Sequence, residues 1–588
     1  MSVQDIPAPA PAEPAALAAA AAKQPWWRSL AWVPSLYLAM GIPFNVVMGG
    51  TAARMYKSLG YPDSKITIAL GSIGVAWSLK PLWAAFLDMY RTKKFFVLLM
   101  EVLLGILFTS VAMSLPVSGF FQVSVALFWV AAFASSTQDI CADGVYLTSL
   151  DRSAQASLAG VQGMFWVGGK LLATGVLIAV LDKLRIAEGW SQLRMWSSVM
   201  LTCAGAMLAL AVYHFFFLPT GSIADRPENV RQVIKDFGRT AVSFFDKRAF
   251  WGMIAFVFLY RIGEGLIIME GALFLQSDVS KGGLGLSAGD VSSIDAVYGT
   301  IASIIAGLLG GAFASWLTLP RALGVLGLCL NVPHLTYVFL SHLAASHHGV
   351  DYATIVTAVS IEKFGYSFGF VGNMVYMMQQ LAPGRSTMTH YAFATSLMNL
   401  MLVPTNMISG PLAEWLGFST FFFVVMFASV PSAWAAFRAP FPLEMGSKKV
   451  GADTAAKAID DNVVTVDDPS VLSPEQRAVQ VLAGRASMFA MLNILVILVL
   501  DSRFLGSLRE ADVHSTMRVV FFVALVASAV LKVVIGRLTL RKVAEVEAEA
   551  ARVRETVYVG NARGAKWATL VCAAAGVAVV GLGAALTF

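Results

Sequence analysis

Charged residues are scarce in this chain of 588 residues: lysine, arginine, aspartate and glutamate make up only 13% of it. An average soluble domain carries about 25%. Hydrophobic residues make up 57%, and the mean hydropathy is +0.70. This composition excludes an ordinary soluble protein and predicts an all-α polytopic membrane protein. The net charge of +6 does not indicate nucleic-acid binding, because the basic residues of membrane proteins collect on cytoplasmic loops.

Motifs of ATP-driven and metal-dependent proteins are also missing. The chain has no Walker lysine loop, no HExxH and no CxxC, so neither ATP hydrolysis nor zinc chemistry has support. The four cysteines lie in or beside apolar runs, at spacings that suit neither a metal site nor a disulfide framework. They are Cys141, Cys203, Cys329 and Cys572. We therefore expect no enzyme activity, no catalytic residues, no metal and no cofactor.

Apolar runs long enough to cross a bilayer, about 17–25 residues, define the predicted organisation. Residues 1–25 are rich in alanine and proline and lack the early basic cluster of a secretory signal, so we interpret them as a flexible cytoplasmic tail. Six runs follow in 26–218, at 31–52, 65–87, 95–115, 120–147, 156–181 and 194–218. Six more lie in 249–438, at 249–276, 288–314, 321–342, 352–381, 387–412 and 418–438. The basic segment 219–248 between the two sets is predicted to be a cytoplasmic loop.

The C-terminal part adds further apolar runs. Residues 439–480 are polar and partly acidic, which is typical of a linker. Runs near 486–505, 518–536 and 566–588 follow within 481–588, so we expect about two or three extra transmembrane helices. The first of these runs ends at Asp501 and Arg503, and lying along the membrane surface is its alternative. With the N-terminus in the cytoplasm, the loops on that side hold most of the lysine and arginine, which is the usual bias.

The most informative polar block lies in the second half of the fourth run, where Gln138, Asp139 and Asp143 interrupt an apolar helix. A carboxylate inside a bilayer costs roughly 2.5–3.5 kcal/mol on insertion scales, so it usually faces water or a partner. Asp139 and Asp143 are four residues apart and therefore share one helix face. The block predicts a polar pathway through the membrane. Its alternative is a cytoplasmic helix end with Asp143 in ordinary water.

Two basic features of the first half carry further predictions. In the stretch from Lys80 to Lys94, Lys80, Asp88 and Arg91 are predicted to form a conformational latch between helices. Positive-inside topology, with Lys80 extending to the surface, is the alternative. Lys170 lies in the middle of the fifth run, too deep to reach the surface easily. We expect it to pair with Asp139 or Asp143, either for function or as a structural salt bridge.

The seventh and tenth runs also carry charges. Arg261 and Glu264 are three residues apart and are predicted to pair, whereas Glu270 points elsewhere. Ionisable groups in such spans commonly bind ions or substrate, although this pair could simply stabilise a helix end. In the tenth run, Glu362 lies beside Lys363 in a glycine-rich stretch. Its aromatic residues suit either stacking on a sugar or plain packing, and they are Tyr366, Phe368, Phe370 and Tyr376.

Several stretches together carry a family resemblance. The Q-D-I-x-x-D block at 138–143 resembles that of AmpG-type muropeptide permeases, which are major facilitator proteins related to acetyl-coenzyme A transporters. K-P-L-W-A-A-F-L-D at 80–88, L-Y-R-I-G-E at 259–264 and G-G-A-F-A-S-W-L-T-L-P-R-A-L at 310–323 fit the same family. The resemblance covers roughly 30–440. It implies the major facilitator fold, with 6+6 transmembrane helices around one central site.

The resemblance also implies a function. Family members import N-acetylglucosamine–anhydro-N-acetylmuramic acid, with or without peptide, across the bacterial inner membrane, driven by protons. We therefore expect a monomeric, multi-pass inner-membrane permease of peptidoglycan recycling, with a link to β-lactam resistance. The proton-coupling residues would be Asp139, Asp143, Glu264 and Glu362. The substrate-binding residues would be Gln138, Trp166, Lys170, Arg261, Glu270, Asn373 and Tyr376.

Departures from the family pattern leave the cargo open. Ala85 stands where the family has proline, and Met164-Phe165-Trp166 stands where it usually has a Tyr-Arg pair. These positions fall where substrate would be recognised. Another amino-sugar oligosaccharide or a siderophore is therefore an alternative cargo, and a membrane scaffold or receptor that transports nothing is an alternative class.

Overall fold

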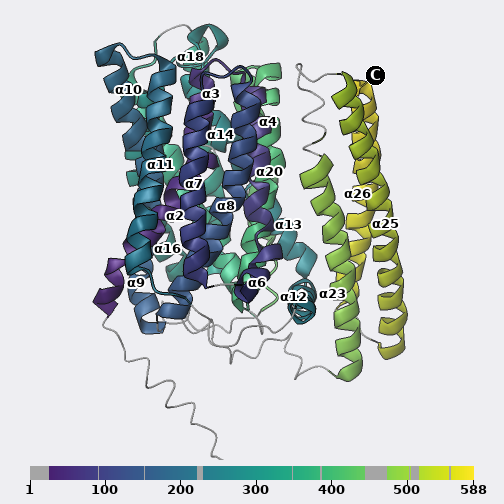
Figure 1. Cartoon of the computed structure of the whole chain (residues 1–588). Helices are drawn as coiled ribbons and strands as arrows, with labels where there is room; N and C mark the ends of the chain where they lie inside the picture. The colour runs from purple at the N-terminus through teal and green to yellow at the C-terminus, as the bar shows by residue number, and fades with distance from the viewer. Residues whose placement is uncertain are drawn as a thin grey trace, which may run out of the picture.

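A computed structural model describes most of the chain. The described residues are 26–48, 50–90, 92–150, 152–221, 230–346, 349–383, 387–443, 473–501, 504, 515–554 and 558–587. All regular elements in these ranges are helices that run mainly in one direction, up and down a common axis (Figure 1). The all-α fold class expected from the composition is confirmed.

Two helical halves form the main bundle. The N-terminal half contains η1 (Trp26–Ala31), α2 (Val33–Val47), α3 (Thr51–Ser58), α4 (Asp63–Ile73), α5 (Val75–Leu79), α6 (Pro81–Tyr90), α7 (Lys93–Ser114), α8 (Phe120–Ser149), α9 (Arg152–Leu171), η2 (Leu172–Val176), α10 (Leu177–Glu188) and α11 (Gln192–Phe217). The C-terminal half contains α13 (Phe250–Tyr260), α14 (Ile262–Gln276), η3 (Val279–Lys281), α15 (Ala288–Ser292), η4 (Ser293–Tyr298), α16 (Gly299–Leu317), α17 (Leu319–Asn331), η5 (Val332–His334), α18 (Leu335–Ala345), α19 (Tyr352–Tyr376), η6 (Met377–Leu381), α20 (Thr387–Leu416) and α21 (Phe418–Arg438).

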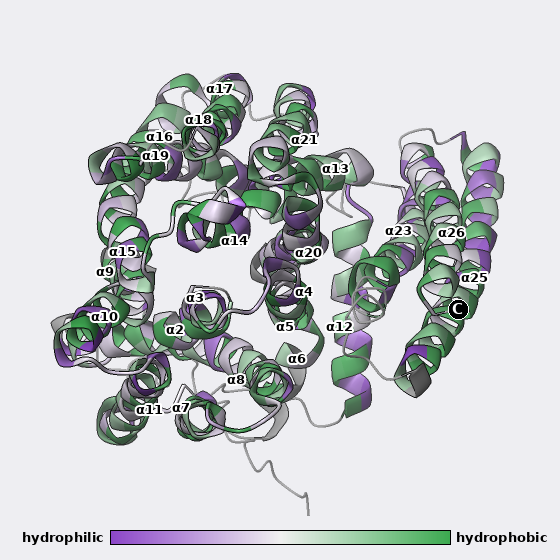
Figure 2. Ribbon diagram, turned by 90° about the horizontal axis from the view of Figure 1, so that it is seen from above, coloured by the Kyte–Doolittle hydropathy of each residue, from purple (hydrophilic) through white to green (hydrophobic). Residues whose placement is uncertain are grey.

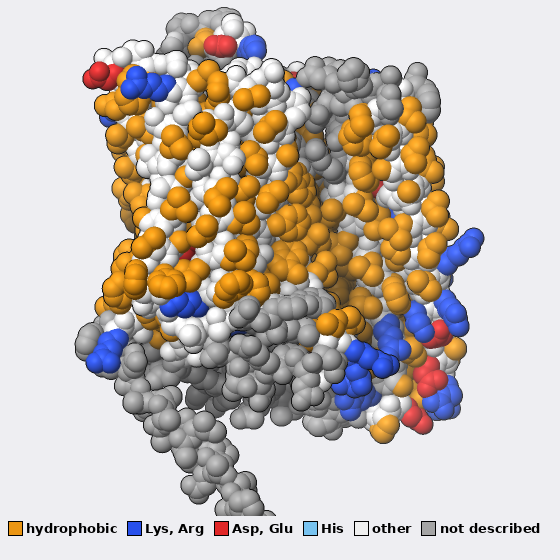
Figure 3. All heavy atoms as spheres, viewed as in Figure 1, with side chains coloured by type: hydrophobic (Ala, Val, Ile, Leu, Met, Phe, Trp, Pro, Cys, Tyr) orange, Lys and Arg blue, Asp and Glu red, His pale blue; other side chains and the backbone are white. Residues whose placement is uncertain are grey.

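Among the residues that the structure describes, twelve helices are long and apolar enough to cross a membrane, three of them in the C-terminal part. Three further predicted spans correspond to α4–α6, α19 and α20, which are interrupted or more polar. Apolar side chains cover the middle of the visible surface, and the described charged side chains collect toward its two ends (Figure 3). This distribution is the one that a lipid environment selects.

Several predicted spans are broken midway. Gly74 separates α4 from α5, Arg261 separates α13 from α14, and Pro333 falls in the short η5 between α17 and α18. A broken helix frees backbone polar groups, which is tolerated in a membrane only where protein or water covers them. The breaks therefore mark the interior of the bundle as the polar region of the protein.

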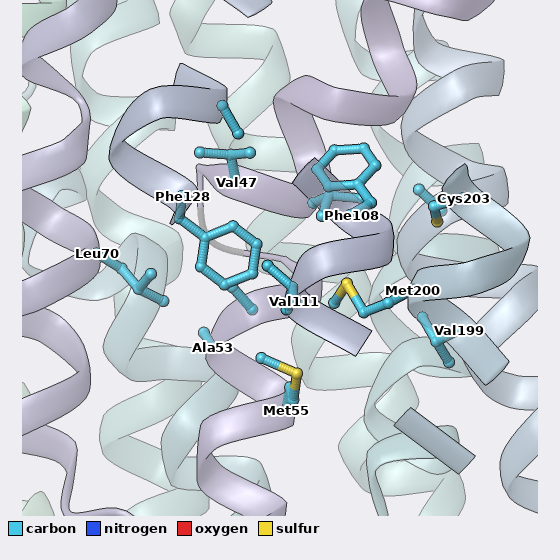
Figure 4. Close-up of a cluster of buried hydrophobic side chains, with 14 of the residues drawn as sticks. Val47, Ala53, Met55, Leu70, Phe108, Val111, Phe128, Val199, Met200 and Cys203 are labelled. Carbon is cyan, nitrogen blue, oxygen red and sulfur yellow. The ribbon is translucent and has the colours of Figure 1, made fainter. Parts of the chain in front are cut away.

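Each half has an apolar core of its own. In the N-terminal half, Phe108 of α7, Phe128 of α8 and Met200 of α11 are fully buried and lie close together (Figure 4). Close packing of α2 on α9 depends on small residues: a Cβ at Gly41 or Gly169 would collide with the backbone of the facing helix. This contact holds the end of α9, with Trp166 and Lys170, directly against α2.

The segment that joins the halves contains an additional helix, α12 (Val230–Phe245). It lies across the bundle axis rather than along it, and polar and apolar residues alternate along it (Figure 2). Val233, Phe244 and Phe245 are buried, while several charged residues between them are exposed. This amphipathic pattern is typical of a helix that lies in a membrane interface.

The C-terminal part forms a three-helix unit beside the main bundle (Figures 1 and 2). It consists of α23 (Pro474–Leu495) continued by η7 (Val496–Asp501), α25 (Ser515–Val553) and α26 (Val559–Thr587). Asp501 is buried and pairs with Lys532 and Ser528 of α25. Because α23 runs parallel to the other two helices, the alternative in which 486–505 lies along the surface is wrong.

Candidate functional site

The two halves are joined by hydrogen bonds at one end of the bundle, the upper end in Figure 1. Arg54 pairs with Asp295 at 2.7 Å, the backbone N–H of Ser64 donates to Glu414 at 2.9 Å, and that of Gly289 donates to Asp182 at 3.0 Å. We call this contact the upper seam. Its residues are Arg54, Lys57, Asp63, Ser64, Thr67 and Asp182 of the N-terminal half and Glu270, Gln276, Ser277, Gly289, Asp295, Ser409, Gly410 and Glu414 of the C-terminal half.

The two acids of α8 lie deeper and have different partners. Lys80, at the break between α5 and α6, donates to Asp139 at 2.8 Å, and both side chains are about one-fifth exposed. Asp143, one turn further along α8, accepts a hydrogen bond from the hydroxyl of Tyr37 on α2 at 2.9 Å. Each acid therefore has a partner within the bundle, and the polar pathway that they are expected to line stays a prediction. Lys80 pairs with Asp139, whereas the latch with Asp88 and Arg91 stays a prediction, because Arg91 and the side chain of Asp88 lie outside the described part of the chain.

The expected partner of Lys170 is wrong. Its ammonium lies over the rings of Trp166 and Phe44, 4.5 and 5.5 Å from their centroids, and pairs with neither acid of α8. Lys80 and Tyr37 already hold those acids. Lys170 instead interacts electrostatically with Asp295 and Lys363 in the other half. An ammonium over aromatic faces gains about 0.5–2 kcal/mol from cation–π attraction.

A chain of charges crosses between the halves at the lower edge of the upper seam. Asp295 of η4 contacts Arg54 of α3 at 2.7 Å and Lys363 of α19 at 3.4 Å, and Lys363 is also 3.4 Å from Glu362. Arg54 is buried, whereas Asp295 is 30% exposed and Lys363 is 23% exposed. With Lys170 nearby, three cations face two carboxylates. The site therefore has an excess of positive charge where the halves meet.

The predicted pair in the seventh span is confirmed. Arg261 donates two parallel hydrogen bonds to the carboxylate of Glu264, one of them 2.6 Å long, and both side chains are buried. The guanidinium also lies 4.8 Å from the ring centroid of Phe370 on α19. A bidentate ion pair of this kind has a fixed geometry. Whether it takes part in coupling or binding stays a prediction.

Three residues predicted to bind substrate are fully buried, each within the half to which it belongs. Gln138 donates to Glu101 of α7 at 3.1 Å, and Glu101 also contacts His214 of α11 at 2.7 Å. Tyr376 donates to the carbonyl of Pro440. The burial of Gln138 and Tyr376 does not fit a substrate-binding role, because their polar groups are engaged in the core. Asn373 is also buried, with no hydrogen-bond partner among the described residues, and its role stays a prediction.

Sequence reasoning missed three residues of the site. Asp295 is one of two carboxylates in the apolar run 288–314, the other being Asp290, and Glu101 is the lone carboxylate in 95–115; an acid in a span is a signal that could have found both. Arg54 lies just beyond the predicted end of the first run, on the side opposite the cytoplasm, where the positive-inside bias gives no reason for a basic residue. Only the three-dimensional structure brings it to Asp295.

The sequence also contains G-Y-S-F-G at 365–369, which matches the nucleophile-elbow pattern of hydrolases. That pattern works at a sharp turn from a strand to a helix, whereas these residues lie inside the long helix α19. The string therefore gives no support for an enzyme. What the geometry offers is a set of partly exposed charges and aromatic rings, from both halves, inside a membrane bundle.

Comparisons with known proteins agree with this geometry. No family model matches the chain. It is 24% identical over 417 residues to the anhydromuropeptide permease of Escherichia coli strain K12, covering 67% of this chain and 76% of that protein. It is 21% identical over 418 residues to a protein named transporter AmpG 4 in Rickettsia conorii, covering 68% and 93%.

Solved structures identify the fold. The D-xylose-proton symporter superposes with a TM-score of 0.52 at 13% identity, covering 73% of this chain and 99% of that one. The nucleoside transporter NupG superposes with a TM-score of 0.50 at 15% identity, covering 70% and 98%. The predicted major facilitator fold is confirmed, and the chain is a distant homologue of the anhydromuropeptide permeases. These relatives and structural neighbours are transporters and not enzymes.

Proposed function

We propose that the chain is a multi-pass secondary transporter that imports muropeptide-like amino sugars across the bacterial inner membrane together with protons. The cargo is N-acetylglucosamine–anhydro-N-acetylmuramic acid, with or without peptide. The observation that carries this proposal is the set of partly exposed charges and aromatic rings that both halves present inside the bundle. Its N-terminus lies in the cytoplasm, and it works as a monomer.

The state of the structure supports alternating access. At the upper seam Asp63, Glu270 and Ser277 are buried, whereas Lys80 and Asp139 deeper in the bundle retain solvent access. Access to the deeper residues is therefore from the end opposite to the upper seam, the end that carries the segment between the halves. With that segment in the cytoplasm, this is an inward-facing state. Transport then requires the upper seam to open toward the other side.

The paired acids of α8 suit proton coupling. Two carboxylates on one helix face repel each other when both are ionised. Lys80 neutralises only Asp139, so Asp143 is the natural carrier of the transported proton, and the Tyr37 hydroxyl stabilises it once the proton has left. Glu264 and Glu362 are the corresponding candidates in the C-terminal half. Each of them lies beside a cation, Arg261 or Lys363.

The positive excess suits a cargo that carries a carboxylate. Lys170 has no carboxylate in contact among the described residues, and Arg54 and Lys363 share Asp295. A lactyl or peptide carboxylate would supply the missing negative charge. The rings of Trp166 and Phe44 lie 5.6 Å apart and offer apolar faces to a sugar ring. These residues form the proposed recognition site, together with the Arg261–Glu264 pair.

Uptake of labelled anhydro-muropeptide into membrane vesicles tests the proposal. We expect accumulation that requires an inward proton gradient and collapses with a protonophore. Asp139→Asn should abolish gradient-driven uptake. Gradient-independent uptake would contradict proton coupling, and full activity of Asp139→Asn would remove that residue from the mechanism. If an amino-sugar oligosaccharide or a ferric siderophore competed for the binding site and unlabelled muropeptide did not, the competing compound would be assigned as the cargo. An absence of counterflow for every cargo would favour a scaffold or receptor.

A further inference from the structure

Glu270 on α14 is a carboxylate with no access to solvent at the upper seam. Its side chain is fully buried, and neither carboxylate oxygen accepts a hydrogen bond from the described residues. The hydroxyl of Ser409 on α20 is within reach, but it donates to the backbone carbonyl of Asn406 at 2.8 Å. An ionised carboxylate that is buried without donors is strongly destabilised relative to its neutral form. With the two halves in contact, binding a proton would remove the uncompensated charge of Glu270.

The charged neighbours of Glu270 come from both halves. Lys57 of α3 and Asp63 of α4 belong to the N-terminal half, and Glu414 belongs to α20 of the C-terminal half. Lys57 is already committed to Asp63 at 2.6 Å, and Glu414 accepts from the backbone of Ser64 at 2.9 Å. Lys281, the last residue of η3, interacts electrostatically with Asp63.

On the remaining faces of α14 the described cations are already paired: Arg261 pairs with Glu264, and Arg54 of α3 pairs with Asp295. The side that meets α21 is lined by Phe422 and Val425, and Tyr337 of α18 lies against Gly271. Around Glu270 the seam therefore contains three carboxylates, Asp63, Glu270 and Glu414, whose one close lysine is already paired. This balance favours a neutral Glu270 for as long as the two halves remain in contact.

We propose that Glu270 is a proton-binding residue that controls the upper seam, protonated when the halves close there and ionised when they separate. The proposal deepens the proposed function, since it rests on alternating access, but it does not depend on the identity of the cargo. When the seam opens, water reaches Glu270 and stabilises its charge. Before the seam closes again, the residue takes a proton from the side to which the seam opens. It therefore acts as a gate residue and not, as the sequence suggested, as a substrate ligand.

The proposal makes closure of the seam depend on pH. The closed state binds one proton more than the open state, so alkaline pH favours opening. Over the pH range in which only the closed state holds that proton, the ratio of closed to open molecules falls about tenfold for each unit of pH. This proton site is separate from Asp139 and Asp143, which lie on the side that solvent already reaches. The two sites can therefore be tested independently.

Distances across the upper end provide the test. Spin labels at Ser118→Cys and Ala345→Cys, which are exposed on the two halves, are introduced after the four native cysteines have been replaced. The full chain is measured in lipid nanodiscs without cargo by electron–electron double resonance. The measurements are made at about pH 5 and about pH 9, which bracket the range over which a buried carboxyl group releases its proton. We expect a short distance at acidic pH and a growing long-distance population at alkaline pH.

Two variants make the test specific. Glu270→Gln, which copies the protonated side chain, should keep the short distance at both pH values. Glu188→Gln, at the exposed end of α10, is the matched control and should shift like the wild type. A wild-type pH shift that survives in Glu270→Gln would overturn the proposal. So would a distance in the wild type that does not respond to pH.

Infrared difference spectroscopy gives a second readout that does not need the variant to transport. At acidic pH the wild type should show the carbonyl band of a buried protonated carboxyl group, and the band should disappear at alkaline pH. The same band should be missing in Glu270→Gln and present in Glu188→Gln. A carboxylate band without the protonated form at acidic pH would also overturn the proposal. Neither readout involves cargo, so failure of muropeptide uptake would leave both interpretable.

Discussion

Lys80 donates a hydrogen bond to Asp139 across 2.8 Å, and so joins the break between α5 and α6 to the middle of α8. The two residues are 59 positions apart in the chain. In this contact Asp139 is paired with a cation, whereas Asp143 on the same helix is hydrogen-bonded to the neutral hydroxyl of Tyr37. The polar interior of the N-terminal half is organised around it.

The first prediction concerns this ion pair. Lys80→Met leaves Asp139 without its cation, and we expect a loss of about 1–3 kcal/mol in stability, because a partly exposed pair costs less to break than a fully buried one. Thermal unfolding in detergent should show the lower midpoint. Uptake should also fall at least tenfold. The double variant Lys80→Met/Asp139→Asn should regain much of the stability, since no uncompensated charge remains, but it should not regain proton-driven uptake.

If Lys80→Met and the double variant had the same midpoint, the pair would not couple the two residues energetically. Lys65→Met provides a control for the loss of a lysine elsewhere in the same half.

The second prediction concerns recognition of the cargo. Lys170→Ala removes the cation over Trp166 and Phe44, and we expect KM for anhydro-muropeptide to rise about tenfold, equivalent to about 1.4 kcal/mol, with less effect on stability. Lys170→Arg should retain part of the affinity, because a guanidinium also binds carboxylates and stacks on aromatic rings. Binding measured by quenching of tryptophan fluorescence should follow the same order. Equal affinity of Lys170→Ala and wild type would exclude this residue from the binding site.

The third prediction separates a structural role from a binding role for Gln138. Glu101, Gln138 and His214 form a hydrogen-bonded network with no exposed atoms in α7, α8 and α11. Gln138→Leu should lower the midpoint of thermal unfolding and leave KM unchanged, because the amide faces Glu101 and not the cargo. Glu101→Ala should cost more, about 2–5 kcal/mol, since it leaves two buried polar partners unpaired. An increase in KM with unchanged stability in Gln138→Leu would restore the substrate-binding role.

Local spacing explains what the sequence could predict. Arg261 and Glu264 are one helical turn apart, so their pairing follows from helix geometry alone, and Asp139 and Asp143 share a face for the same reason. The helices themselves follow from apolar runs of the length of a bilayer.

Contacts between distant helices could not be predicted from one sequence. Arg54 and Asp295 are 241 positions apart, and helix periodicity says nothing about which spans become neighbours. The error over Lys170 has this origin, because its partner was chosen by proximity of runs in the chain. Asp295 and Glu101 are different. Each is an acid in an apolar run, and the cost of burying it is a sufficient reason to include it among the site residues.

The last prediction concerns the ion pair between the halves. Asp295→Asn removes the charge that Arg54 contacts at 2.7 Å, and Arg54, which is 1% exposed, then retains its hydrogen bond to the carbonyl of Gly50. We expect about 1–3 kcal/mol less stability for the closed upper seam, because the guanidinium stays buried without a carboxylate, and Asp295 itself is partly exposed. Opening of the seam rehydrates Arg54, so the variant should populate the opposite state more than the wild type does.

Spin labels at Ser118→Cys and Ala345→Cys measure this shift, which should occur at every pH because it does not involve a proton. Asp290→Asn, an exposed acid on the neighbouring helix α15, is the control and should leave the distances unchanged. A shift in Asp295→Asn that disappears at acidic pH would mean that protonation of the seam, and not the Arg54 pair, holds the two halves together.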